Sequence, residues 1–143
     1  MSARPRPGAT LLEAMVVVSF LAILATLSIP RAAALLDRAR VTAATNEAAA
    51  TFGVARHLAI RHARRSTVLI DPVPGTLTVR VGLDTVHHRP LAATHRVALR
   101  ATRDSMSYHP TGVGYGAANL TLVIERGSAA DTVVVSRLGR VRR

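Results

Sequence analysis

Four arginines crowd the last seven residues of the chain, and their side chains are well suited to bind an anion. Arg137, Arg140, Arg142 and Arg143 surround one glycine in the segment RLGRVRR. A guanidinium group donates paired hydrogen bonds to phosphate oxygens, and such contacts give DNA affinity that depends on salt rather than on base sequence. In an extended strand Arg140 and Arg142 face the same side, so the spacing predicts a phosphate-binding surface. A solvated terminus in an arginine-rich chain explains the same residues without any ligand.

Glu13 is the second unusual residue, because it stands at the start of a long apolar run. The sixteen residues 14–29 contain only three polar side chains, and with the two leucines before Glu13 the run approaches the roughly 20 residues that a membrane-spanning helix needs. A carboxylate beside such a run is unfavourable by a few kcal/mol unless a counter-charge neutralises it. Cleavage after Gly8 would free an amine on Ala9, which a neighbouring subunit could offer to Glu13. Alternatively, Glu13 lies at headgroup depth and favours the helix N-terminus by under about 1 kcal/mol.

Three kinds of segment fit the opening of the chain. A secretory signal peptide would use Arg4 and Arg6 as its basic start and the alanines at 32–34 as its cleavage site. A plain transmembrane anchor would keep all of these residues. A prepilin leader would instead be cut just before the apolar run.

The segment GATLLE at residues 8–13, followed by an apolar run that ends at Pro30, resembles the leader of type IV pilins and type II secretion pseudopilins. This resemblance implies that a prepilin peptidase cuts after Gly8, that Ala9 becomes N-methylated, and that the helix assembles with other pilin or pseudopilin subunits at the inner membrane. Family members usually carry Phe or Met where this chain has Ala9. Pro30 falls where pilin helices carry a proline; it removes one helix hydrogen bond, which predicts a bend or local melting near Thr26.

The elements that position these residues follow from composition and periodicity. Residues 31–65 contain no proline and many alanines, which favours helix. Small and apolar side chains recur there at spacings of three and four and predict one buried stripe; they are Val41, Ala44, Ala48, Phe52, Ala55 and Ala59. We therefore divide the chain into a leader (1–8), a transmembrane or filament-core helix (9–30), its continuation (31–65) and a β-rich domain (66–143).

Short apolar alternations fill the β-rich domain. They predict strands near 66–71, 76–82, 97–102, 105–110, 119–127 and 131–143, whereas 84–96 and 111–118 read as loop and glycine-rich connector. A long helix followed by antiparallel strands is an α+β layout. We expect a single sheet packed on the helix, as in a pilin.

The end of the chain resembles more narrowly the C-terminal domain of the GspH/FimT family. The matching features are a Pro-x-Gly turn at Pro110-Thr111-Gly112, two closing strands and the terminal sequence GRVR at 139–142. The family includes minor pseudopilins of secretion systems and a minor pilin that binds DNA during natural transformation. The resemblance implies that Arg140 and Arg142 contact DNA, with charge added by their neighbours.

Composition excludes several other classes of protein. The chain has a formal charge of +11, so we expect an acidic partner. It has no cysteine and therefore no disulfide. The six histidines lack the spacing of a metal site, the glycines at 112–116 lack the lysine of a phosphate loop, and no catalytic pattern is present. No metal, cofactor or enzymatic activity is therefore expected. The two resemblances imply a minor pilin or pseudopilin that is anchored once in the inner membrane, with its β-rich domain in the periplasm. The alternative is a minor pilin that captures DNA with its terminal arginines.

Overall fold

The first element among the described residues is a helix of 51 residues. The computed structural model describes residues 10–116 and 119–143, apart from the side chains of residues 27 and 28, so the proposed leader and the Gly8–Ala9 bond lie outside the described residues. Helix α1 spans Leu11–Arg61 and ends four residues before the predicted boundary. The chain reverses there through a turn in which Ala63 has a φ of 46° and the N–H of Arg64 donates to the carbonyl of Ala59.

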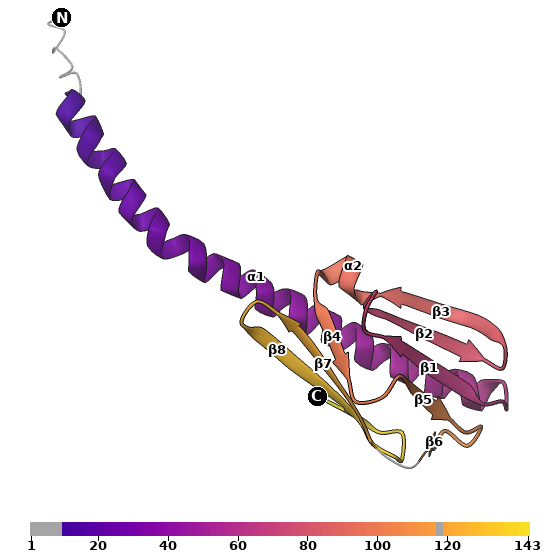
Figure 1. Cartoon of the computed structure of the whole chain (residues 1–143). Coiled ribbons are helices and arrows are strands. Elements are labelled where there is room, and N and C mark those ends of the chain that lie inside the picture. Colours follow the sequence, from indigo (N-terminus) through magenta and orange to yellow (C-terminus); the bar gives the residue numbers. More distant parts are fainter. Residues whose placement is uncertain (1–9, 117–118) are drawn as a thin grey trace, which may run out of the picture. The chain divides into compact units, whose positions relative to one another are not determined.

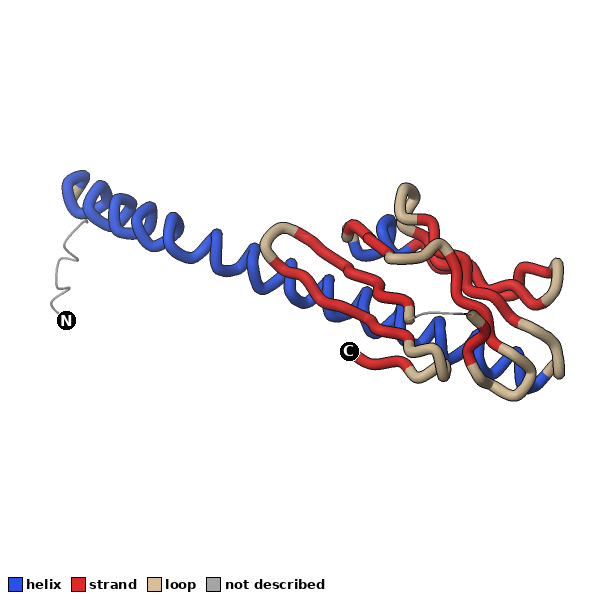
Figure 2. Tube along the Cα trace, turned by 60° about the horizontal axis from the view of Figure 1, so that its bottom comes forward, coloured by secondary structure: helices blue, strands red, loops and turns tan. Residues whose placement is uncertain are grey.

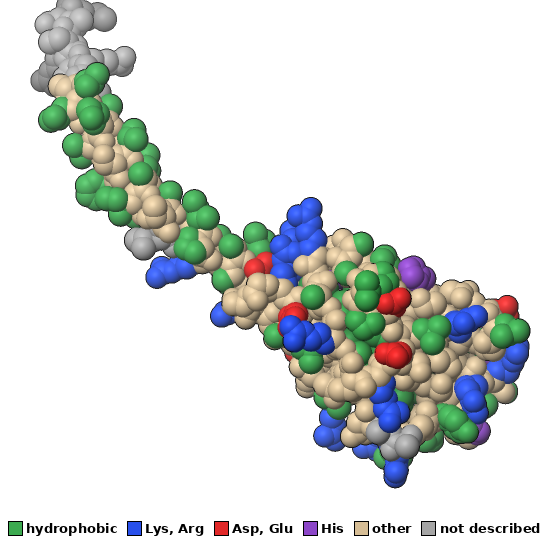
Figure 3. Space-filling view, in the orientation of Figure 1, with side chains coloured by type: hydrophobic (Ala, Val, Ile, Leu, Met, Phe, Trp, Pro, Cys, Tyr) green, Lys and Arg blue, Asp and Glu red, His purple; other side chains and the backbone are tan. Residues whose placement is uncertain are grey.

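The chain divides into two compact units, Met1–Leu35 and Leu36–Arg143. In the first unit, hydrophobic side chains follow the helix and stand exposed (Figure 3). By length and composition this helix can cross a membrane. A continuous apolar surface of this kind is unfavourable in water, and lipid or a neighbouring apolar helix would stabilise it.

The second unit holds nine antiparallel strands among its described residues, arranged in two sheets. Sheet A has the order β3-β2-β1-β5-β6 and sheet B the order β4-β7-β8-β9. Their bounds are β1 Ser66–Asp71, β2 Thr76–Val81, β3 Asp84–Pro90, β4 Ala98–Ala101, β5 Ser105–Tyr108, β6 Gly114–Tyr115, β7 Leu120–Arg126, β8 Ala129–Val135 and β9 Val141–Arg142. The α+β class is confirmed, but the expectation of one sheet is wrong.

The segment 84–96 explains why there are two sheets. It was expected to be a loop, yet it forms the edge strand β3 and the short helix α2, Leu91–His95. Its strand carries polar, exposed side chains and a register shift opposite Val79 and Arg80, which hid the alternation that marks a buried strand. Leu91 is buried in the core, so α2 turns the chain away from β3, and β4 pairs with β7 instead.

Both sheets pack on the second half of α1, which runs along them (Figures 1 and 2). The predicted stripe is confirmed: all six of its residues are at most 2% exposed and belong to one core with the inward side chains of the strands. Because four of the six are alanines, the backbones of helix and sheets can approach closely. The hydroxyl of Ser66, at the start of β1, donates to the carbonyl of Ala55 at 2.5 Å and so ties the sheet to the helix.

Candidate functional site

The first candidate site is the N-terminal end of α1. The N–H of Glu13 donates to the hydroxyl oxygen of Thr10 at 3.2 Å, and the N–H of Ala14 donates to the carbonyl of Thr10 at 3.1 Å. Thr10 is therefore the N-cap, and Glu13 occupies the third helical position, where the TLLE sequence forms one half of a capping box. The carboxylate lies exposed at the positive end of the helix dipole.

Two polar side chains within the apolar part of α1, those of Ser19 and Thr26, form hydrogen bonds to the helix backbone. The hydroxyl of Ser19 donates to the carbonyl of Met15 at 2.8 Å, and that of Thr26 donates to Ile23 at 2.7 Å. Such bonds within the helix remove the penalty for placing these hydroxyls in lipid. The sequence predicted a bend or local melting near Thr26. The helix is continuous across Pro30, so local melting is not observed, and a bend remains the expected effect of this proline.

The second candidate site is the arginine-rich end of the chain, which strand β9 places on sheet B. Val141 pairs with Val135 and packs against the core, whereas Arg142 pairs with Val134 and is exposed. Because successive side chains of a strand alternate, Arg142 points to the outer face of sheet B.

Arg143 does not share that outer face. Its guanidinium donates to Asp131 at 3.2 Å and also to the amide oxygen of Asn46 on α1. Burial alone would raise the pKa of Asp131, but hydrogen bonds from the Thr132 N–H and from Arg143 outweigh it and hold this pKa below its usual value. The sequence grouped Arg143 with the other three arginines, and the structure assigns it an acidic partner instead.

This ion pair gives a pH dependence of stability. The folded-state pKa of Asp131 is lowered, so its contribution is complete above the ordinary value of 3.8 and is lost as the pH falls from there towards the folded-state value. We expect the Asp131→Asn variant to be less stable than the wild type at pH 7. Below the folded-state pKa of Asp131, the difference in unfolding free energy between the two proteins should become smaller. Thermal unfolding, followed by tyrosine fluorescence at pH 7 and at a pH below the folded-state pKa of Asp131, measures this. The control is Asp84→Asn, which changes a carboxylate that has no ion pair in the described residues. Equal differences at both pH values would contradict the prediction.

Gly139 has a structural role in the terminal motif. Its φ is 77°, and a Cβ added there would lie 3.0 Å from the ring of Tyr108 and 3.2 Å from the carbonyl oxygen of Gly112. The turn 136–139 therefore rests directly on the Pro-x-Gly turn and on a fully buried tyrosine, whose pKa burial raises to about 12. Two sequence features that stand far apart in the chain are parts of one packed corner.

Arg137 and Arg140 flank this corner, and both are exposed. Their backbones are fixed: the N–H of Arg137 donates to Asn119 at 2.9 Å, and the N–H of Arg140 donates to the hydroxyl of Ser136 at 3.1 Å. Within the described residues neither guanidinium has an ion pair. Their charges thus remain available to a ligand.

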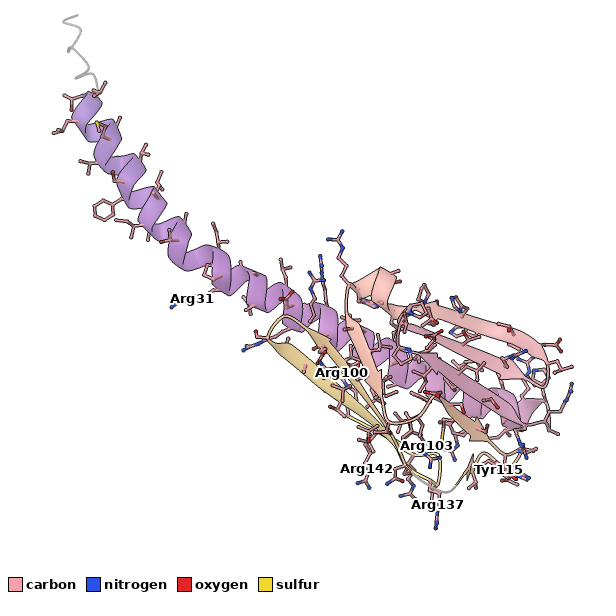
Figure 4. All side chains as sticks on the ribbon, in the orientation of Figure 1. Arg31, Arg100, Arg103, Tyr115, Arg137 and Arg142 are labelled. Carbon is pink, nitrogen blue, oxygen red and sulfur yellow. The ribbon has the colours of Figure 1, made fainter. Side chains whose placement is uncertain are left out.

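Sequence reasoning missed Arg103, which lies in the connection between β4 and β5. Thr102 donates its N–H to the carbonyl of Thr121, Thr121 pairs with Val134, and Val134 pairs with Arg142. Figure 4 shows Arg103 at the same end of the unit as Arg137 and Arg142. Because 39 positions separate Arg103 from Arg142, only the pairing of the strands brings them together, and no local pattern could have revealed it.

Two of the histidines, His87 and His95, belong to one cluster of side-chain contacts around Glu47 and Arg89. Glu47 on α1 accepts a hydrogen bond from His95 at 2.7 Å and forms an ion pair with Arg89 at 3.4 Å. Arg89 also donates a hydrogen bond to His87 at 2.8 Å. Burial, followed by the charge of Arg89, lowers the pKa of His87 and so favours the neutral ring that accepts this bond. This cluster fastens β3 and α2 to α1. Across residues 10–116 and 119–143, no three His, Asp or Glu side chains converge as metal ligands would.

Comparison with known proteins agrees with this architecture. No protein-family model matches the chain, and no curated protein sequence is similar to it. The chain is similar in structure to the type IV minor pilin FimU of Pseudomonas aeruginosa strain PAO1. One crystal form of FimU gives a TM-score of 0.64 at 14% identity over 73% of this chain and 88% of FimU; a second gives 0.59 at 14% identity over 71% and 90%. At this identity the likeness establishes the fold, and the chain has a pilin-like fold.

Proposed function

We propose that the chain is a minor pilin or pseudopilin, a structural subunit of a type IV pilus or of a type II secretion pseudopilus. The observation that carries this proposal is an exposed apolar helix whose capped N-terminus bears Glu13, joined to a β-rich unit of pilin-like fold. An exposed apolar helix needs a continuous apolar environment, first the membrane and then neighbouring helices. No catalytic role is part of the proposal.

In this proposal a prepilin peptidase cuts the chain after Gly8. The freed amine of Ala9 then stands four residues before Glu13, and in a low-dielectric bundle the amine of one subunit neutralises the carboxylate of the next. Before assembly the helix crosses the inner membrane once, with its N-terminus inside and the β-rich unit in the periplasm. The resemblance of residues 8–30 to pilin leaders supports both the cleavage site and this orientation.

Processing gives a direct test. In the host, with its prepilin peptidase present, we expect the mature protein to begin at Ala9, with a mass that fits N-methylation. Intact-mass spectrometry of membrane-extracted protein measures this. Gly8→Val should leave the uncut precursor, because a branched side chain replaces the small residue at the scissile bond. Gly53→Val, the same change outside the leader, should be cut normally.

A mature chain that begins near residue 34 would instead establish a secretory signal peptide. A chain that keeps residues 1–8 in the presence of the peptidase would establish a plain membrane anchor. Either result refutes the proposal.

DNA capture is a second candidate function, and one observation favours it. Arg137, Arg140 and Arg142 are exposed and have no ion pair in the described residues. Hydrogen bonds fix the backbone at Arg137 and Arg140, and Arg137 and Arg142 lie at the same end of the unit as Arg103 (Figure 4). Guanidinium groups that are spaced along one surface can contact successive phosphates of a duplex. The GspH/FimT resemblance of the terminal motif supports the same reading.

An electrophoretic mobility shift of the full chain in detergent tests DNA capture. We expect Arg140→Ala with Arg142→Ala to weaken binding of a mixed-sequence duplex and to reduce the dependence of affinity on salt by a log–log slope of about 2, since each lost phosphate contact removes about 0.9. The matched control is Arg38→Ala with Arg40→Ala, which removes the same charge from α1. If both double variants behave alike, these arginines contribute net charge and are not a DNA site.

A further inference from the structure

Basic side chains without acidic partners gather at the C-terminal end of α1. Residues 56–65 contain four arginines, two histidines and no acid; Arg56, His57, Arg61, His62, Arg64 and Arg65 are all exposed. None of the four arginines has an ion pair within the described part of the chain. Arg65 lies over the ring of Tyr115 at 4.0 Å from its centroid, Arg64 lies close to Gly82 and Arg56 close to Gly112. None of these contacts neutralises the charge of the arginine.

The same stretch of α1 is hollowed on the side that the sheets leave open. A hollow of about 560 Å³ is lined by Gly53, Val54, His57, Leu58 and Arg61, and one of about 330 Å³ is lined by Gly53, Arg56, His57 and Ile60. Gly53 belongs to both, and a Cβ added there would meet no atom within 4 Å. We call these two hollows together the Gly53 groove.

The walls of the Gly53 groove are aliphatic and its rim is basic. Val54 is 38% exposed and Ile60 is 48% exposed, although both lie on a helix whose opposite side is fully buried. Arg56 and Arg61 border the two hollows. An apolar floor with a charged rim is the usual composition of a protein interface.

We propose that the Gly53 groove receives an acidic helix from a different subunit of the assembly, an inference that rests on the proposed function. Gly53, His57 and Arg61 form a row with a spacing of four, and helices pack by fitting ridges into grooves between such rows. A glycine in that row lets the partner's backbone approach closely. Asp or Glu side chains of the partner then reach Arg56 and Arg61 at the rim.

Charge and chemistry distinguish this occupant from two others. A second copy of this chain that packed through the same face would bring a second set of arginines against the first, and like charges across an interface are unfavourable. Any other contact between two copies brings together two chains of formal charge +11. A nucleic acid would match the charge, but its phosphates gain nothing from the aliphatic walls. No Phe, Tyr or Trp lines the groove, and His57 is its single aromatic ring, so the groove offers no platform for stacking successive bases.

Site-specific photo-cross-linking in the host tests the proposal with the full chain. A benzophenone amino acid replaces Val54 in the groove, and in a separate strain it replaces Val73, which is 95% exposed in the turn between β1 and β2. We expect Val54, and not Val73, to cross-link to another pilin-like subunit. Mass spectrometry should place the linkage in a helical segment with Asp or Glu within one turn.

Charge and shape variants sharpen this test. With the probe at position 54, Arg61→Glu should lower the cross-link yield about tenfold or more, as truncating a close interfacial charge pair does, whereas Arg103→Glu, which changes the net charge equally, should not. Gly53→Leu places a side chain in the Gly53 groove and should lower the cross-link yield without changing any charge. Replacing the partner's identified acid by arginine should restore the yield of the Arg61→Glu variant.

Three results would overturn the proposal. Cross-linking between differently tagged copies of this chain would identify a second copy as the occupant. A linkage to a segment without acidic residues would remove the role of charge. Loss of duplex binding by the purified chain on Arg61→Glu, with no change in protein cross-links, would identify the groove as a DNA contact. Cleavage before Ala9 is independent of the groove, so a processed subunit that fails these tests refutes only this inference.

Discussion

Replacing Glu13 by leucine should abolish incorporation of the protein into its filament while leaving it in the membrane. Leucine suits the apolar helix and removes the only described acid near its N-terminus. The neighbouring subunit's amine would then be buried without a counter-charge, and breaking a buried pair in this way costs about 3–5 kcal/mol. Incorporation should fall by more than about a hundredfold, since 1.4 kcal/mol is a factor of ten. Quantitative immunoblots of sheared filaments and of membranes measure the two populations.

Two further variants separate charge from shape at this position. Glu13→Gln keeps the size and hydrogen-bonding groups of the side chain and should fail as Glu13→Leu does. Glu13→Asp keeps the charge on a shorter side chain and should retain part of the incorporation. If the leucine variant enters filaments at the wild-type level, Glu13 only supports the helix N-terminus, a role that the Thr10 cap makes small.

Replacing Phe52 by alanine should have the largest effect on the stability of the β-rich unit. Phe52 is fully buried on α1 between the helix and the sheets, and it is the largest side chain of the helical stripe. Truncating a buried phenylalanine costs about 3–5 kcal/mol, a large share of the roughly 5–15 kcal/mol that a domain has. Tyr108 and Tyr115 both lie in this unit and the chain has no tryptophan, so tyrosine fluorescence reports its unfolding without a signal from the apolar end of α1.

Val54 supplies the matched control for Phe52. It lies two positions away on the same helix but is 38% exposed on the opposite side. Val54→Ala should change the free energy of unfolding by less than about 0.5 kcal/mol, as exposed substitutions do. Similar destabilisation by both variants would mean that the stripe does not hold the sheets.

How much could be read from the sequence depended on the range of the interaction. The helical stripe was predicted in full, because a spacing of three and four places its residues on one face whatever packs there. The second sheet was missed, because the position of β4 beside β7 depends on where Leu91 is buried. The fold class followed from local periodicity, and the strand order did not.

The arginine site shows the same limit. Alternation along β9 correctly separates Arg142 from Val141, since the pleat of a strand fixes that relation. The partner of Arg143 is Asp131 on a neighbouring strand, and the position of Arg103 depends on three successive strand pairings. The Gly53 groove was equally hidden, because a lone glycine in a helix does not reveal which side of the helix the sheets will leave open.

Strand β3 has a consequence for how neighbouring molecules can approach. It is an outer strand of sheet A, yet its register shift opposite Val79 and Arg80, its charged Arg89 and its final Pro90 interrupt the row of backbone groups on its open side. Features of this kind discourage foreign strands from extending a sheet. Strand β3 thus resists pairing with a strand of a neighbouring molecule, and contacts at this edge are left to side chains, whose identity can discriminate one neighbour from another.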